Sequence, residues 1–256
     1  MPVETDLEPG RRPARPDVAE PGISPYRSLT PRSTVEMLAR AAAVFRKDIT
    51  SEFRTRYAVN AIALFAVTTL VAVGFAVGGV GISQPVQASL LWIVIYFSAM
   101  SGLSRVFVRE EEARTASALR LAAAPGAVLG GKLLFNLVLL VSLEVVIVPL
   151  FVGMMHLEVS GWPLMLATLA AGSAGLAVTA TVVAAIVSKA NAKGALFAVL
   201  SFPILLPLLV GAIHGTQAAL SSARFAAGMQ DFKLLVSYTG VMFIVSLFVF
   251  RFIWED

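Results

Sequence analysis

The sequence contains no cysteine, only two histidines and few charged residues for a chain of 256. Without cysteine there is no disulfide scaffold, thiol nucleophile, zinc-thiolate site or iron–sulfur ligand. Charged residues make up 14% of the chain and hydrophobic residues 57%, whereas soluble domains carry roughly 25% charged residues. A soluble fold of this size could not cover so much apolar surface with so few charges. The composition therefore excludes a soluble enzyme and a nucleic-acid binder, despite the net charge of +4.

The hydrophobic residues are gathered in long runs with almost no charge. Residues 57–104 contain no charged side chain, and a glycine-rich turn at 78–81 divides this run into two halves. A helix that spans a bilayer needs about 20 mostly apolar residues. The sequence therefore predicts an all-α integral membrane protein, with a domain at 57–256 built from six transmembrane helices. These helices are expected at 57–78, 86–106, 131–153, 162–187, 194–213 and 234–253.

Basic residues are distributed unevenly between the loops of this arrangement. If the N-terminus is cytoplasmic, 18 of the 20 basic residues fall on the cytoplasmic side, and only Arg224 and Lys233 fall on the other. Cytoplasmic loops of membrane proteins carry an excess of lysine and arginine. The distribution predicts that both termini are cytoplasmic.

The residues before the first predicted span divide into a tail and a helix. Residues 1–32 are rich in proline and have no apolar core of a signal peptide, which predicts a disordered cytoplasmic tail. Ser33 and Glu36 fit a capping box, and apolar residues then recur at helical spacing. These residues are Val35, Leu38, Ala42, Phe45, Ile49 and Phe53. They predict an amphipathic interfacial helix over 33–56, which either couples to a partner as an elbow or only anchors the chain.

The longest cytoplasmic loop, 105–132, is rich in charge and in alanine. Its acids fit the first turn of a short helix, which two leucines extend and Pro125 ends. The acids and leucines are Glu110, Glu111, Glu112, Leu119 and Leu121. The loop is either a lever for a partner domain or a solvated connector.

The same loop ends in a sequence with the spacing of a nucleotide-binding loop. Gly126 to Lys132 matches GxxxxGK, but the next residue is Leu133, so no hydroxyl is available for Mg²⁺. No strand precedes this sequence, and a membrane span follows. Any ATP chemistry must come from another chain.

A few polar or helix-bending residues fall inside or beside the predicted spans. Glu144 is the ionisable residue that lies deep in a span, so it either serves function or forms a hydrogen bond between helices. Pro203 and Pro207 predict a bend in the fifth span. His156 and His214 are expected at outer helix ends, where histidines are more often solvated than haem ligands.

Four stretches of the chain correspond, in order, to a charged elbow with the first span, a linker, a fifth span with Pro-x-x-x-Pro, and the C-terminal end. They are FRKDITSEFRTRYAVNAIALF at 45–65, FVREEEARTASALRLAAAPGAVLGGKLLFN at 107–136, KANAKGALFAVLSFPILLPLLVGA at 189–212 and FIWED at 252–256. In their order and spacing they resemble the haem exporter protein B (CcmB) family, the membrane subunit of the cytochrome c maturation ABC complex.

The resemblance implies a non-catalytic permease of ABC-2-type architecture in the bacterial cytoplasmic (inner) membrane. Its implied partners are a cytoplasmic ATPase subunit, a haem-handling membrane protein and a haem chaperone, in an assembly with two membrane subunits or in a hetero-complex. No cofactor or metal is expected to bind this chain directly: ATP would act through the partner, and haem would be handled by the complex. The acids and leucines of the linker would contact the ATPase, flanked by Phe45, Ile49 and Phe53.

Other functions remain as alternatives. An ABC-2-type permease that exports a lipid, polysaccharide or drug would share the elbow and the acidic linker. An intramembrane enzyme would need paired catalytic groups inside the bilayer, whereas Glu144 stands alone. A secondary transporter is disfavoured because the sequence shows no obvious inverted repeat.

Overall fold

The regular elements of the chain are helices throughout the part that the structure describes. The computed structural model describes residues 34–77, 81–103, 119, 123–188 and 193–255. The helices are α1 (Thr34–Thr55), α2 (Tyr57–Val77), α3 (Gln84–Leu103), α6 (Pro125–Met155), α7 (Trp162–Ser188), α8 (Lys193–Ser221), the short 3-10 helix η2 (Phe225–Gly228) and α9 (Met229–Glu255). Within the described ranges, six helices are long and apolar enough to cross a membrane. The prediction of an all-α protein with six transmembrane helices is confirmed.

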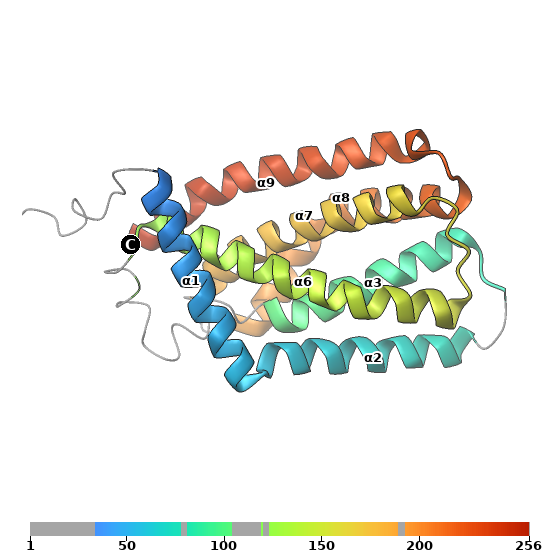
Figure 1. Ribbon diagram of the computed structural model, residues 1–256, viewed down its shortest axis with the longest axis horizontal. Helices are drawn as coiled ribbons and strands as arrows, with labels where there is room; N and C mark the ends of the chain where they lie inside the picture. Colours follow the sequence, from blue (N-terminus) through green and yellow to red (C-terminus); the bar gives the residue numbers. More distant parts are fainter. Residues whose placement is uncertain (1–33, 78–80, 104–118, 120–122, 189–192, 256) are drawn as a thin grey trace, which may run out of the picture.

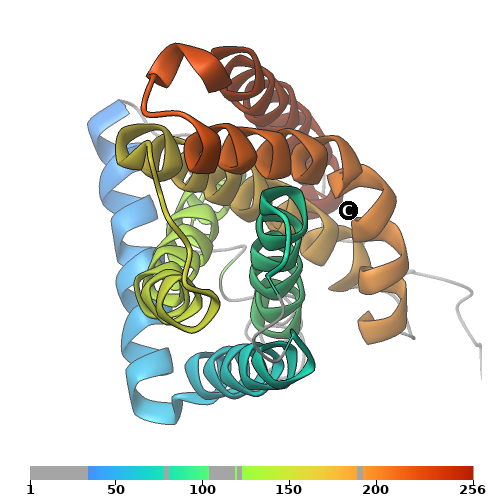
Figure 2. The same cartoon turned by 90° about the vertical axis from the view of Figure 1, so that its right-hand side faces the viewer.

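The six long helices lie alongside one another, and α1 crosses them at one end of the bundle, beside α6 (Figure 1). The C-terminus lies at this same end. Figure 2, which looks along the bundle, places α2 and α9 at opposite edges. Most residues of α7 are buried, whereas few residues of α2 and α9 are, and most of the exposed residues on these two helices are apolar. An apolar outer surface of this kind suits a bilayer, because lipid tails take the place of water as the solvent.

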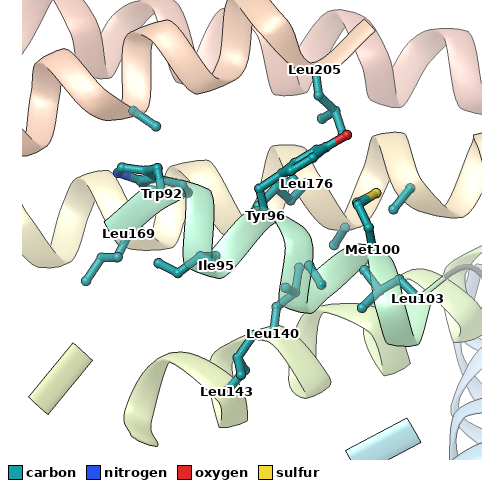
Figure 3. Packing of buried hydrophobic residues seen from close by; sticks show 14 of the residues in the cluster. Trp92, Ile95, Tyr96, Met100, Leu103, Leu140, Leu143, Leu169, Leu176 and Leu205 are labelled. Carbon is teal, nitrogen blue, oxygen red and sulfur yellow. The ribbon is translucent and has the colours of Figure 1, made fainter. Parts of the chain in front are cut away.

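Helix α3 contributes several large side chains to the core of the bundle. Side chains of α3 meet leucines of the three neighbouring helices α6, α7 and α8 (Figure 3). The residues labelled there are Trp92, Ile95, Tyr96, Met100 and Leu103 of α3, Leu140 and Leu143 of α6, Leu169 and Leu176 of α7, and Leu205 of α8. The Trp92 ring lies against Gly172 of α7, and its indole N–H donates to the Thr216 hydroxyl of α8 over 2.8 Å. One side chain of α3 therefore joins three helices.

Three helix boundaries differ from those that the sequence predicted. The third long helix, α6, begins at Pro125, earlier than expected, because proline is well tolerated in the first turn of a helix. At the opposite end of the bundle, α8 continues to Ser221 and α9 begins at Met229. Hydropathy marks only the part of a helix that is apolar enough for a membrane, and polar residues such as Gln217 and Asp231 continue these helices beyond it.

The earlier start of α6 also places the GxxxxGK sequence inside a helix. Gly126 and Lys132 both lie within the continuous helix α6. A phosphate-binding loop needs successive backbone N–H groups that point freely at the ligand, and most of these groups bond within a helix. The rejection of a nucleotide-binding loop on sequence grounds agrees with this geometry.

Candidate functional site

A buried ion pair connects α1 to the beginning of α6. The Lys132 ammonium of α6 lies 2.9 Å from a carboxylate oxygen of Asp48 of α1, and the two side chains are only 2% and 9% exposed. Lys47 lies 3.4 Å from the other oxygen of the same carboxylate and is about half exposed. Because a charge without a partner is costly to bury, this pair holds α1 and α6 at one relative position.

Two glycines of α6 let α1 come unusually close. A Cβ atom on Gly131 would lie 2.7 Å from the Val44 Cβ and 2.8 Å from the Ala41 carbonyl oxygen. A Cβ atom on Gly130 would lie 3.6 Å from the Ala41 Cβ. Any larger residue at position 131 would push α1 away and lengthen the Lys132–Asp48 pair. We refer to Ala41, Val44, Asp48, Gly130, Gly131 and Lys132 together as the α1–α6 joint.

The turn from α1 into α2 consists of a single residue in the left-handed conformation. Arg56 has a φ of 51°, and its N–H bonds to the Glu52 carbonyl oxygen over 2.5 Å. The buried Glu52 carboxylate accepts a hydrogen bond from the Val59 N–H over 3.0 Å. It thereby satisfies one of the free N–H groups of the first turn of α2, where the helix dipole also favours a negative charge.

Two side-chain hydrogen bonds link α6 to α7 inside the bundle. The Asn136 amide donates to the Thr181 hydroxyl over 2.7 Å, and the Ser173 hydroxyl donates to the Glu144 carboxylate. All four residues are buried. Glu144 follows Asn136 in α6 by the same number of residues as Ser173 precedes Thr181 in α7. This equal spacing in opposite directions is what two antiparallel helices in a single register require. Both bonds therefore fix the same register.

The sequence predicts that Glu144 is an acid inside a membrane span. The structure places it at the interface of α6 and α7, 8% exposed, with the Ser173 hydroxyl as its partner. This is the geometry of a hydrogen bond between two helices, one of the two roles that the sequence left open.

The residues expected to contact an ATPase are only partly described by the structure. Glu110, Glu111, Glu112 and Leu121 lie outside the described residues, and Leu119 is partly buried against the core. On α1, Phe45 and Ile49 are also partly buried against the core, whereas Phe53 is 73% exposed. Of the three α1 residues expected to contact the ATPase, Phe53 therefore has the most surface open to a partner or to lipid.

Helix α8 passes through Pro203 and Pro207 without interruption. The Tyr238 hydroxyl of α9 donates to the Ile204 carbonyl oxygen, between the two prolines, over 2.8 Å. It also lies 3.3 Å from the Thr179 hydroxyl of α7. The proline-containing part of α8 is thus attached to both neighbouring helices, and the expected bend there stays a prediction.

The two histidines lie apart in the chain and have different surroundings. His156 follows the last residue of α6 with a φ of 49°. His214 lies within α8 rather than at its end, which corrects the sequence expectation; its side chain is mostly exposed and lies 3.9 Å from Asp231. Among the described residues, no three His, Asp or Glu side chains gather closely enough to hold a metal ion.

Sequence reasoning missed the joint itself: the predicted apolar face of the 33–56 helix does not include Asp48, and Lys132 stands where the predicted linker 105–132 meets the span 131–153. A signal was present in the spacing. Ala41, Val44, Asp48 and Glu52 recur at steps of three and four, so they share one face of α1. This face lies beside the apolar stripe, and its residues Ala41, Val44 and Asp48 pack on α6.

Comparison with known families agrees with this architecture. The family model described as CcmB protein matches residues 39–253, a range that takes in most of α1 and every membrane-spanning helix. No curated protein sequence matches the chain at a significant level. The matched length and the six apolar helices lead to one conclusion: the chain belongs to the CcmB family, and is a multi-pass membrane component of the haem exporter of cytochrome c maturation.

Proposed function

We propose that the chain is the transmembrane subunit of an ABC transporter-type complex. It couples ATP hydrolysis by a partner subunit to haem delivery, or to release of the haem-loaded chaperone, in cytochrome c maturation. The observation that carries this proposal is the position of α1, which lies across one end of the bundle and is fixed to the beginning of α6 by a buried ion pair. A partner at this end could act on the spans through α1 without entering the membrane.

The proposed orientation places the α1 end of the bundle in the cytoplasm of a bacterial cell. Support comes from the basic residues of α1 and from Arg251 near the end of α9, which lie at that end, while Arg224 and Lys233 lie at the other. A reporter fused after Met155 should therefore be external, and a reporter fused after Asp256 should be cytoplasmic. A cytoplasmic reading at Met155 would contradict this orientation.

Contact with the ATPase is proposed to run through the linker and through the exposed Phe53 of α1. The three linker acids would meet a basic groove of the ATPase, and Leu119 and Leu121 would supply buried apolar area. Exposed ion pairs contribute only about 0–1 kcal/mol each, so a single substitution is expected to do little.

Reversing all three acids with Glu110→Lys, Glu111→Lys and Glu112→Lys should detach the ATPase, because three attractive contacts become repulsive. The measurement is co-purification of the ATPase with the tagged protein, together with staining for covalent c-type haem in cells that depend on the variant. A matched variant with three glutamines removes the charges without repulsion and should retain more ATPase. An unchanged ATPase yield with a normally inserted lysine variant would show that the linker is only a connector.

The same haem stain separates this function from export of a lipid, polysaccharide or drug. Cells that lack the chain should lose covalent c-type haem if the complex serves cytochrome c maturation. Normal haem staining in such cells would favour another exported substrate.

A further inference from the structure

The helix that precedes the first span in the sequence packs mainly on another span. Between α1 and α2 there is one connecting residue, Arg56, and the two helices share few contacts. The contacts of α1 with α6 are far more extensive and include the backbone approach at Gly130 and Gly131. Helix α1 therefore packs mainly on α6, although it directly precedes α2 in the sequence.

The chemistry of the joint resists separation of the two helices. If α1 moved away from α6, Lys132 would lose Asp48 at a place where its side chain is 2% exposed. A buried charge that loses its partner is much less stable than a paired one. A hinge within the α1–α6 joint would therefore be opposed throughout a transport cycle. The left-handed residue between α1 and α2, Arg56, is exposed.

The next link in the structure is the pair of hydrogen bonds from α6 to α7. Asn136–Thr181 and Glu144–Ser173 fix one register between these helices, so that sliding α6 along α7 would break both bonds at once. In turn, α7 is packed extensively on α8 and α9. A displacement of α1 has a continuous route of buried contacts into the centre of the bundle.

We infer that α1 and α6 move as one rigid body, with Lys132 and Asp48 as the positioning residues that hold them together. Force applied to α1 then reaches α6 and α7 through buried side-chain contacts, in addition to the covalent path to the first span, α2, through Arg56. This inference rests on the proposed function, because it takes the ATPase partner as the source of that force. It assigns a mechanical role to two charged residues, Asp48 and Lys132.

A disulfide across the joint tests whether the two helices ever separate. In Ala41→Cys with Gly130→Cys, the Cβ atoms would be about 3.6 Å apart, within the range of about 3.5–4.5 Å that disulfides require. The chain has no native cysteine, so these two thiols are its only ones. The measurement is the rate of ATP hydrolysis by the purified complex, oxidised and then reduced, with each single-cysteine variant as a control. The rate of the oxidised complex should equal the rate of the reduced complex.

A reversible loss of hydrolysis on oxidation, absent from the single-cysteine variants, would overturn the rigid-body inference. A second variant tests the ion pair. Lys132→Met should lower the rate of hydrolysis, and the disulfide should restore it by replacing the lost joint. A Lys132→Met complex that the disulfide fails to rescue would remove the positioning role from Lys132. If Lys132→Met does not insert into the membrane, the disulfide in the otherwise unchanged chain still tests whether α1 and α6 move as one body.

The proposed function and this inference fail in different ways. If the ATPase does not co-purify with the unmodified chain, the proposed function is wrong. If it co-purifies but oxidation of the cysteine pair stops hydrolysis, the function stands and the rigid joint is wrong.

Discussion

Replacing Lys132 with methionine should lower the thermal stability of the solubilised protein by on the order of 10 °C. Methionine keeps most of the length and volume of lysine but leaves the buried Asp48 carboxylate without its closest partner, 2.9 Å away. Removing one member of a buried ion pair costs about 3–5 kcal/mol, and in chains of about 150–250 residues each kcal/mol shifts the melting temperature by about 2–4 °C. Lys47, 3.4 Å from Asp48, offsets part of this cost.

The measurement is the unfolding temperature in detergent, followed by intrinsic tryptophan fluorescence. The matched control is Lys233→Met, the same change at an exposed lysine of α9, which should leave the unfolding temperature almost unchanged. Combining Lys132→Met with Asp48→Val removes both charges, and most of the lost stability should return, because apolar replacement of a whole buried pair is often neutral. Equal melting temperatures for Lys132→Met and the unmodified protein would show that the pair is not buried in the protein in solution.

The number of spans could be predicted from the sequence because charge is the strongest constraint on a membrane helix. A run such as 57–104, which contains no charged residue, has few alternatives to two buried or lipid-facing helices. The helical spacing after Ser33 likewise indicated a helix where α1 is found. The ends of the helices were harder to predict from the sequence. Residues such as Gln217 and Asp231 continue α8 and α9 beyond the hydrophobic stretch, and hydropathy does not distinguish polar helical residues from loop residues.

The joint could not be predicted by the same reasoning. Amphipathic patterns assign apolar residues to the interior and charges to water, yet on α1 the exposed positions include Val35 and Leu38, while Asp48 and Glu52 are buried. At the edge of a membrane, exposed apolar side chains can face lipid, and a charge can be buried if another chain segment neutralises it. The partner of Asp48 is Lys132, far along the chain, and no local rule connects the two positions.

Glu144 could be predicted from the sequence in part. Its burial followed from the sequence, since an ionisable group inside a span has to face the bundle or find a partner. The identity of that partner did not follow, because Ser173 is one of many small polar residues in α7 and only the register of α6 against α7 selects it.

Replacing Gly172 with alanine should also destabilise the protein, by on the order of 5 °C in melting temperature. A Cβ atom at this position of α7 would overlap the six-membered ring of Trp92, whose Cη2, Cζ3 and Cζ2 atoms are its three nearest neighbours. Trp92 is fully buried, and its indole N–H is held by the Thr216 hydroxyl, so the ring can move only by giving up that bond. Adding a methyl group to a packed core typically costs about 1–3 kcal/mol, with about 2–4 °C per kcal/mol.

Two comparisons separate overlap with the ring from a general effect of removing a glycine. Gly240→Ala in α9, where a Cβ atom would meet nothing within 4 Å, should keep or raise the melting temperature, because alanine favours helices by about 1 kcal/mol over glycine. In a Trp92→Phe background the three overlapping atoms are gone, so Gly172→Ala should cost much less than it does beside tryptophan. An equal loss in both backgrounds would mean that Gly172 and Trp92 are not in contact, and that the close approach of α3 to α7 does not depend on this glycine.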